Sequence, residues 1–177
     1  LLDASSDATT VAGWWARWPE ANIGFPPGRS GFVVLDVDGP TGETLAQAAG
    51  LLAEPTLEVV TGRTDGGRHR WYRHPGGHIP NGSPFGAGLD VRGDMGYVLL
   101  PPSVHPSGRV YAWRGTLGEI GDLPPHLVSK LQGSPDATEA GPKPDQLPAW
   151  MIPWMTVGEG GRNNTMTRFV GHCFRHG

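Results

Sequence analysis

Two aspartates one residue apart are the part of the sequence best suited to chemistry. Asp36 and Asp38 end an apolar, β-branched run between Gly31 and Gly39, a pattern that predicts a buried strand followed by a glycine turn. Residues i and i+2 of a strand point to the same face, so the two carboxylates should project together. They would repel each other, and a divalent cation, Mg²⁺ or Mn²⁺ for oxygen ligands, would relieve that repulsion. The alternative is a pair that only caps the turn.

Three further groups of polar residues could join this pair. The first is an imidazole just past a glycine pair, where backbone can approach an anion closely. The second is a carboxylate with an arginine on the same strand face, and the third is a hydroxyl with an imidazole at a strand end. Each group alone is also compatible with an ordinary turn or surface role. The groups are His69 after Gly66-Gly67, Asp90 with Arg92, and Ser103 with His105.

The elements that must position these residues are mostly short strands. Alternation places His69 and Trp71 on one face of their strand and Arg68, Arg70 and Tyr72 on the other. The pattern predicts an α+β domain over residues 1–131, a Gly/Pro-rich linker over 132–147 and the start of a C-terminal helical piece over 148–177. The predicted strands are 21–25, 31–39, 56–61, 68–73, 89–93, 97–100 and 109–113, and the predicted helices of the domain are 11–18, 41–52 and 123–131.

Composition narrows the class of protein. With 177 residues, 37% of them hydrophobic, the chain can form one domain with a real core. The single cysteine, Cys173, excludes an intramolecular disulfide framework and a cysteine-based zinc site. No apolar run approaches a membrane span and no signal peptide is recognisable, so we expect an intracellular protein. The net charge of −3 argues against a generally basic nucleic-acid coat. The absence of an initiator methionine suggests a piece of a longer protein.

The basic residues are mostly arginines, and four of them fall between positions 63 and 73. Such a group could form a phosphate-facing patch, because the guanidinium group binds phosphate in a fixed geometry. A solvated arginine-rich hairpin is an equally good interpretation of the composition. The four are Arg63, Arg68, Arg70 and Arg73.

The order of the motifs resembles the bifunctional DNA primase/polymerase (prim-pol) domain of the archaeo-eukaryotic primase superfamily. The resemblance covers about residues 7–113, and the stretch 158–164 is similar to the segment that follows this domain in phage and plasmid replication proteins. The motifs are Trp14-Trp15, Trp18-Pro19-x-Ala21-Asn22-Ile23-Gly24, Val34-Leu35-Asp36-Val37-Asp38, Gly66-Gly67-x-His69, Leu89-Asp90-Val91-Arg92-Gly93-x-x-Gly96-Tyr97-Val98 and Pro101-Pro102-Ser103-x-His105-x-x-Gly108-x-x-Tyr111-x-Trp113.

The resemblance implies an RRM-like antiparallel sheet packed against a small α/β unit, with the active site in the cleft between them. It implies that Asp36, Asp38 and Asp90 hold two divalent ions, Mg²⁺ or Mn²⁺, and that His69 donates to the incoming triphosphate. No zinc is expected. In several relatives a serine lies two residues before this histidine, where this chain has Gly67, so that hydroxyl is missing here. Further nucleotide contacts are expected at Arg68, Arg92, Ser103 and His105.

The leading functional hypothesis is therefore a DNA primase, a DNA polymerase or both. Its implied partners are a single-stranded DNA template with a primer, dNTPs or NTPs, and a fused helicase or other replication module, in the cytoplasm of a bacterial host. One alternative is a metal-dependent nuclease or phosphohydrolase that uses the same carboxylates. Another is a single-stranded nucleic-acid binding module with Trp71, Tyr72 and Arg73 as a stacking platform.

Overall fold

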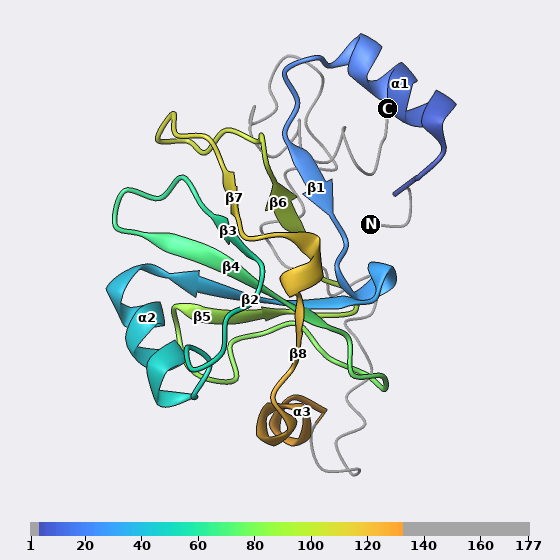
Figure 1. The fold of residues 1–177 in the computed structure, drawn as a ribbon. Helices are drawn as coiled ribbons and strands as arrows, with labels where there is room; N and C mark the ends of the chain where they lie inside the picture. Colours follow the sequence, from blue (N-terminus) through green and yellow to red (C-terminus); the bar gives the residue numbers. More distant parts are fainter. Residues whose placement is uncertain (1–3, 133–177) are drawn as a thin grey trace, which may run out of the picture.

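The computed structural model describes residues 4–132, which fold into a mixed helical and β structure (Figure 1). The predicted α+β class is confirmed. The linker predicted over 132–147, apart from its first residue, and the helical piece predicted over 148–177 lie outside the described residues. The helices are α1 (Ala8–Arg17), α2 (Gly39–Ala48) and α3 (Pro125–Gln132), with one-turn 3-10 helices at Gly28–Ser30 and Leu117–Glu119; the strands are β1 (Ile23–Phe25), β2 (Phe32–Asp38), β3 (Glu58–Val60), β4 (Gly67–Arg73), β5 (Leu89–Arg92), β6 (Val98–Leu100), β7 (Ala112–Arg114) and β8 (Gly121–Asp122).

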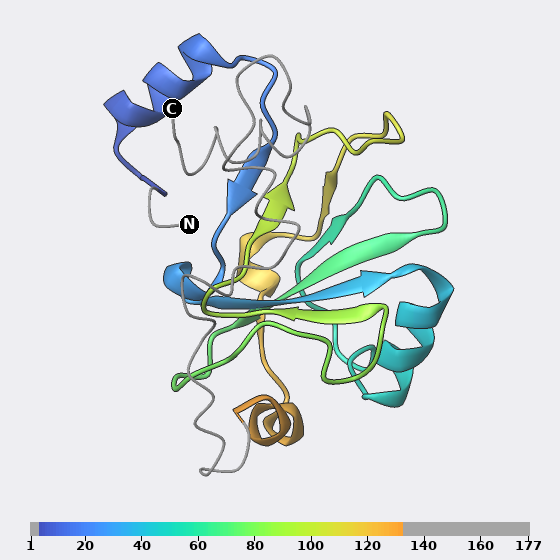
Figure 2. The same ribbon diagram turned by 180° about the vertical axis from the view of Figure 1, so that it is seen from behind.

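The strands form one large sheet and one small one. In the large sheet β5, β2, β4, β3 and β7 lie side by side in antiparallel order, and β8 pairs in parallel with the end of β4. Strands β1 and β6 form a separate antiparallel pair. Figures 1 and 2 show α2 and α3 on one side of the large sheet and the β1–β6 pair on the other. A strand covered on both sides is apolar at most positions, which explains the sequence of β2.

The helices cover one face of the large sheet, which we call the helix face. It carries Val33, Leu35 and Val37 of β2, all buried, and they pack with Ala46 of α2 and Leu127 of α3. Complete burial of each such side chain contributes about 1.5–3 kcal/mol. A slip of one residue would turn the three side chains to the other face, so this core fixes the register of β2.

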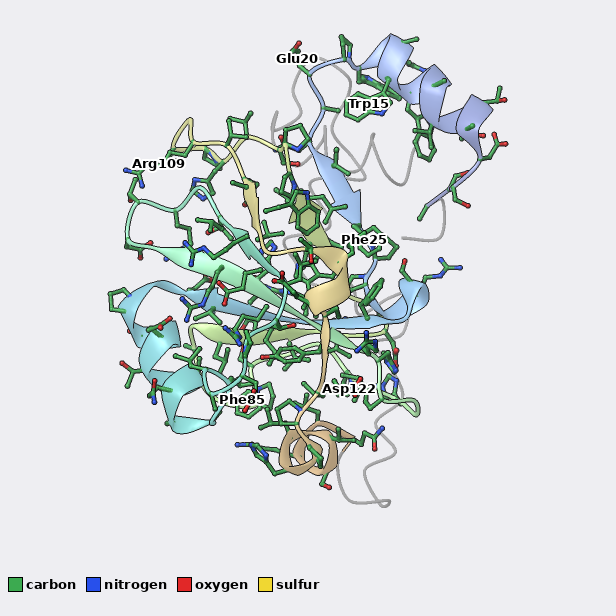
Figure 3. All side chains as sticks on the ribbon, in the orientation of Figure 1. Trp15, Glu20, Phe25, Phe85, Arg109 and Asp122 are labelled. Atoms are coloured by element: carbon green, nitrogen blue, oxygen red, sulfur yellow. The ribbon has the colours of Figure 1, made fainter. Side chains whose placement is uncertain are left out.

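The opposite face carries Val34, Asp36 and Asp38, and we call it the acidic face. Its apolar end forms a second core, in which Val34 packs with Trp71 of β4 beneath the β1–β6 pair. Phe25 of β1 covers this core, with its ring 5.6 Å from the Trp71 ring (Figure 3). Along β2, the apolar part of this face therefore ends where the two aspartates begin.

Several element boundaries differ from the sequence prediction by a few residues, and the short strand β8 was not predicted; two of the differences have a clear local cause. Helix α2 begins at Gly39, directly after β2, where a turn was predicted before a helix starting at 41. Gly39 makes this abrupt start possible because its φ of 59° is a conformation that other residues rarely adopt. Strand β7 covers only the end of the predicted 109–113 segment, because His105 and Arg109 close a tight turn by a backbone hydrogen bond of 2.8 Å.

Candidate active site

A single row across three strands brings the predicted catalytic residues together. Asp36 of β2 is in register with His69 of β4 on one side and with Asp90 of β5 on the other. Directly paired residues of antiparallel strands share a face, with Cβ atoms about 4.5–5.5 Å apart. Asp38 lies two residues further along β2, on the same face. The four residues predicted from three separate motifs therefore meet on the acidic face.

Asp38 does not act as a helix cap. It occupies the N-cap position of α2, yet its side chain makes no capping hydrogen bond. Burial, and then the neighbouring carboxylates of Asp36 and Asp90, raise the pKa of Asp38, while Arg63 opposes the shift. The interpretation of the aspartate pair as a simple turn cap is therefore wrong for Asp38, and its environment holds an excess of negative charge.

Arg92 lies among the acidic residues. Its Nη2 is 2.8 Å from Asp90 Oδ2 and 3.3 Å from Asp36 Oδ2, so one guanidinium bridges two strands of the row. The hydroxyl of Ser83 donates to the other oxygen of Asp90. Sequence reasoning expected Arg92 to contact a nucleotide and missed Ser83, because the long connection between β4 and β5 has no pattern that would single it out.

His69 is buried at the centre of the row, with only 5% of its surface exposed. Its Nε2 lies 3.6 Å from Asp36 Oδ1, and its Nδ1 finds no hydrogen-bond partner among the described residues. Burial lowers the pKa of His69, although Asp36 acts in the opposite direction. The imidazole is therefore neutral near pH 7 and can donate one hydrogen bond.

Tyr111 is a site residue whose role the sequence did not suggest, although it lies in the Tyr-x-Trp motif. Its ring centre is 5.9 Å from that of His69 and 6.2 Å from that of His105. Burial, followed by the charges of Asp36 and Asp38, raises the pKa of Tyr111 to about 12. The phenol therefore stays protonated at any physiological pH.

Basic side chains border the acidic face at the β3–β4 hairpin. Arg63 Nε lies 3.3 Å from Asp38 Oδ1, and its Nη2 lies 2.8 Å from Asp65. Arg109 donates from Nη1 to the Arg63 carbonyl at 3.3 Å, and Figure 3 shows its side chain at the outer end of the neighbouring loop. His105 packs on Gly62, where a Cβ would lie 2.2 Å from the His105 Cβ. Burial and then Arg63 lower the pKa of His105.

Two predicted nucleotide contacts lie elsewhere. Arg68 is in register with Val37, so it belongs to the helix face, where its Nη2 is 2.6 Å from Glu43 Oε2. Ser103 is buried, and its hydroxyl accepts a hydrogen bond of 2.8 Å from the Ile23 amide. The structure therefore does not bring Arg68 together with the acidic residues, and it uses the Ser103 hydroxyl to join β1 to the end of β6.

The arginine patch and the aromatic stacking platform are not formed. Arg70 is buried on the helix face beside Glu58, whereas Arg63 borders the acidic face, so the arginines do not share one surface. Trp71 and Tyr72 are each 3% exposed and point to opposite faces of the sheet. The predicted alternation of this strand is confirmed, and the same alternation leaves no exposed aromatic pair there for stacking bases.

Comparison with known proteins identifies the family of the chain. The family model described as the N-terminal domain of bifunctional DNA primase/polymerase, Prim-Pol, matches residues 1–126. The chain belongs to the Prim-Pol family. A search of curated proteins finds no match to the chain. Membership of the Prim-Pol family indicates DNA primase or polymerase activity in general, and hence nucleic-acid and nucleotide substrates.

The resemblance to prim-pol domains also implies divalent ions, and the donor set of the site fits them. Asp36, Asp38 and Asp90 offer only carboxylate oxygens, and their mutual repulsion contributes to the raised pKa of Asp38. In residues 4–132 no group of three or more His, Cys, Asp or Glu side chains already converges on one ion position. Arg92 lies between two of the carboxylates and is a third exposed, so an ion bound there would take the place of a partly exposed guanidinium contact.

None of the helices in residues 4–132 combines the length and the apolar character needed to cross a bilayer.

Proposed function

We propose that the protein is a template-directed nucleotidyltransferase, the DNA primase and DNA-directed DNA polymerase domain of a phage- or plasmid-type replication protein. It would join a dNTP or NTP to the 3′-hydroxyl of a strand paired with a single-stranded DNA template. The observation that carries this proposal is the cross-strand row in which Asp36 lies between Asp90 and the buried, neutral His69.

The acidic residues would hold the metal. Asp36, Asp38 and Asp90 are the candidate ligands for two Mg²⁺ or Mn²⁺ ions, which would neutralise charge on the attacking 3′-oxygen and the leaving pyrophosphate. This assignment explains why three carboxylates share one face although their charges repel. Without a cation in the working enzyme, that arrangement would cost stability and serve no purpose.

The neighbouring donors would hold the triphosphate. The neutral His69 can donate one hydrogen bond to a phosphate oxygen, and its unpartnered nitrogen shows that the described residues do not use up its capacity. Arg63 and Arg109 border the acidic residues and would attract the same polyanion. A hydrolase acting on a simple phosphodiester would have less need for such a set of donors.

The test is a primer-extension reaction with a primed DNA template, all four dNTPs and Mg²⁺ or Mn²⁺. We expect template-dependent extension, and we expect Asp36→Asn to reduce it at least about a hundredfold. Substituting even an outer-shell partner of a metal ligand lowers metal affinity or activity about 10–100-fold. The matched control is Asp122→Asn, an exposed aspartate on β8 that should extend primers like the wild type. Products formed without primer, in the presence of NTPs and dNTPs, would add primase activity.

Two other outcomes would overturn the proposal. Metal-dependent degradation of the template, without extension, would make the protein a nuclease that uses the same carboxylates. Binding of single-stranded DNA without any chemistry, equal in the wild type and in Asp36→Asn, would make it a binding module.

A further inference from the structure

Thr61 carries a buried hydroxyl that the fold leaves without a partner. The residue directly follows β3, is 8% exposed, and its Oγ1 makes no hydrogen bond within the described residues. Its amide donates to the Gly67 carbonyl at 3.0 Å, which places it opposite Gly67 of β4. Thr61 lies two residues after Val59, which is paired with His69, so its side chain belongs to the acidic face.

A threonine just before β3 shows what a structural hydroxyl looks like in this fold. Thr56 is 7% exposed, almost the same as Thr61. Its hydroxyl donates to the Trp71 carbonyl and accepts from the Gly121 amide at 3.1 Å, so it joins β4 to β8. An unpartnered buried hydroxyl costs stability, whereas a partnered one contributes to it. The hydroxyl of Thr61, unused within the described residues, therefore indicates a partner from outside that part of the structure.

The position of this hydroxyl is defined by Gly67. A Cβ added to Gly67 would lie 2.6 Å from Thr61 Oγ1 and 2.9 Å from Arg63 Cδ. Gly67 is in register with Asp38, so that Cβ would point to the acidic face. The Thr61 hydroxyl thus occupies the space that a side chain at position 67 would use. The sequence shows that Gly67 offers no hydroxyl, but Thr61, at the end of the neighbouring strand β3, places one beside it.

The groups around Thr61 define the ligand. Arg63 lies beside the same position, because its Cδ would also lie 2.9 Å from a Cβ at Gly67, and its side chain is 35% exposed. Arg109 contacts Arg63, and His69 follows Gly67 by two residues on the same face. Two arginines and an imidazole donor make a phosphate oxygen the matching acceptor for the free hydroxyl.

We propose that the Thr61 hydroxyl donates a hydrogen bond to a phosphate oxygen of the incoming nucleoside triphosphate, in the place of a side chain at position 67. This inference rests on the proposed nucleotidyltransferase function, whose triphosphate site it extends. Thr61 is then a substrate-binding residue. Its hydroxyl lacks a hydrogen-bond partner in the free protein and gains one when the substrate binds.

The first test compares Thr61→Val with Thr56→Val. The measurements are the Kd of dATP with Mg²⁺, by calorimetry without DNA, and the thermal midpoint. Thr61→Val should weaken dATP binding about tenfold or more, because a hydrogen bond to a charged acceptor is lost, and should leave the midpoint unchanged or raised. Thr56→Val should do the reverse, with a lower midpoint and an unchanged Kd. Thr61→Ser keeps the hydroxyl and should retain most of the affinity.

The second test moves the hydroxyl from one strand to the other. Gly67→Ser alone crowds the Thr61 hydroxyl, whereas Thr61→Ala with Gly67→Ser frees that space and supplies a hydroxyl from β4. The double variant should bind dATP within a few-fold of the wild type, and Thr61→Ala alone should not. In primer extension the loss should appear in the KM for dNTP rather than in kcat.

Several results would overturn the inference. A Thr61→Val protein that loses thermal stability as Thr56→Val does, with its dATP affinity unchanged, would make the hydroxyl structural. Failure of the double variant to recover affinity while it remains folded would exclude the shared position. A wild-type chain that binds no dATP would overturn the nucleotidyltransferase function itself, and this inference with it.

Discussion

The carboxylates on the two faces of the large sheet have different charged neighbours. On the helix face Glu58 is 7% exposed and lies among three arginines, in contact with Arg70 and with Arg68 and Arg114 at 3.4 Å each. On the acidic face Asp36, Asp38 and Asp90 lie close together, and burial, followed by the charge of Asp36, raises the pKa of Asp38. In the first cluster three arginines surround one carboxylate, whereas in the second three carboxylates share only two arginines, Arg63 and Arg92, among the described residues.

This difference separates a structural from a functional use of charge. A buried ion pair whose partners are all present is compatible with stability, although removing one partner is costly. Like charges held together in a fold are a liability unless a ligand of opposite sign uses them. The comparison therefore predicts that charge-removing substitutions act in opposite directions on the two faces.

Removing the central charge of the helix face should have the largest effect on stability. Glu58→Gln leaves Arg70, which is 5% exposed, without its carboxylate partner. We expect a loss of about 3 kcal/mol in the free energy of unfolding, measured by urea denaturation at pH 7. The matched control is Glu43→Gln, a half-exposed partner of Arg68, which should cost less than about 1 kcal/mol. Equal losses in the two variants would contradict the central role of Glu58.

Protonation of His69 at low pH, which adds a positive charge to the acidic face, should have an intermediate effect on stability. Burial lowers the pKa of His69 in the folded protein. As the pH falls below about 6.5, the unfolded chain takes up a proton that the folded chain resists, so stability decreases. Between pH 7.5 and 5.5 the wild type should lose up to about 1 kcal/mol more than His69→Gln does. Identical urea midpoint shifts in both proteins would exclude a buried, neutral imidazole.

Removing the negative charge of Asp38 should have the smallest effect on stability, and this substitution should stabilise the protein. Because the folded pKa of Asp38 is raised, its charge is unfavourable at neutral pH, and this cost disappears as the pH falls through the folded pKa. Asp38→Asn should therefore gain a few tenths of a kcal/mol at pH 7, since the side chain is a third exposed, and lose that gain at acidic pH. Asp122→Asn should change nothing measurable. A stability loss in Asp38→Asn would show that the carboxylate is structural.

The sequence was sufficient for the faces of the predicted residues in β2 and β4 and for the class of the fold. Alternation correctly placed Asp36 and Asp38 on one face of β2, and it correctly separated His69 from Arg68 and Arg70 within β4. The hydrophobic pattern could do this because the strand period of two is a local property. The meeting of Asp90 with Asp36 followed from motif order in relatives, since nothing in either segment alone encodes their pairing.

The sequence was not sufficient for the partners of the charged and polar side chains. Arg92 contacts Asp36 across 56 positions, and Ser103 accepts from Ile23 across 80. Neither contact leaves a local pattern. The hydroxyl of Thr61 could not be assigned either, because its place above Gly67 depends on strand pairing and on the absence of a side chain. Such contacts are decided by tertiary packing, which periodicity and propensity do not describe.

The registered pairing of β5, β2 and β4 has a consequence for how this chain can change in length. One residue inserted inside β2 ahead of Asp36 would turn that carboxylate toward α2, or would need a bulge that breaks the row. Residues 74–88 connect β4 to β5. Within this connection Gly82 forms an isolated bridge with β5 and Ile79 is buried in the core, whereas the other residues lie outside the strand pairing, where the entropy of closing a loop changes slowly with its length. Insertions and deletions should therefore accumulate over evolutionary time in the parts of that connection outside residues 79–83, while the strands that carry the row keep their spacing.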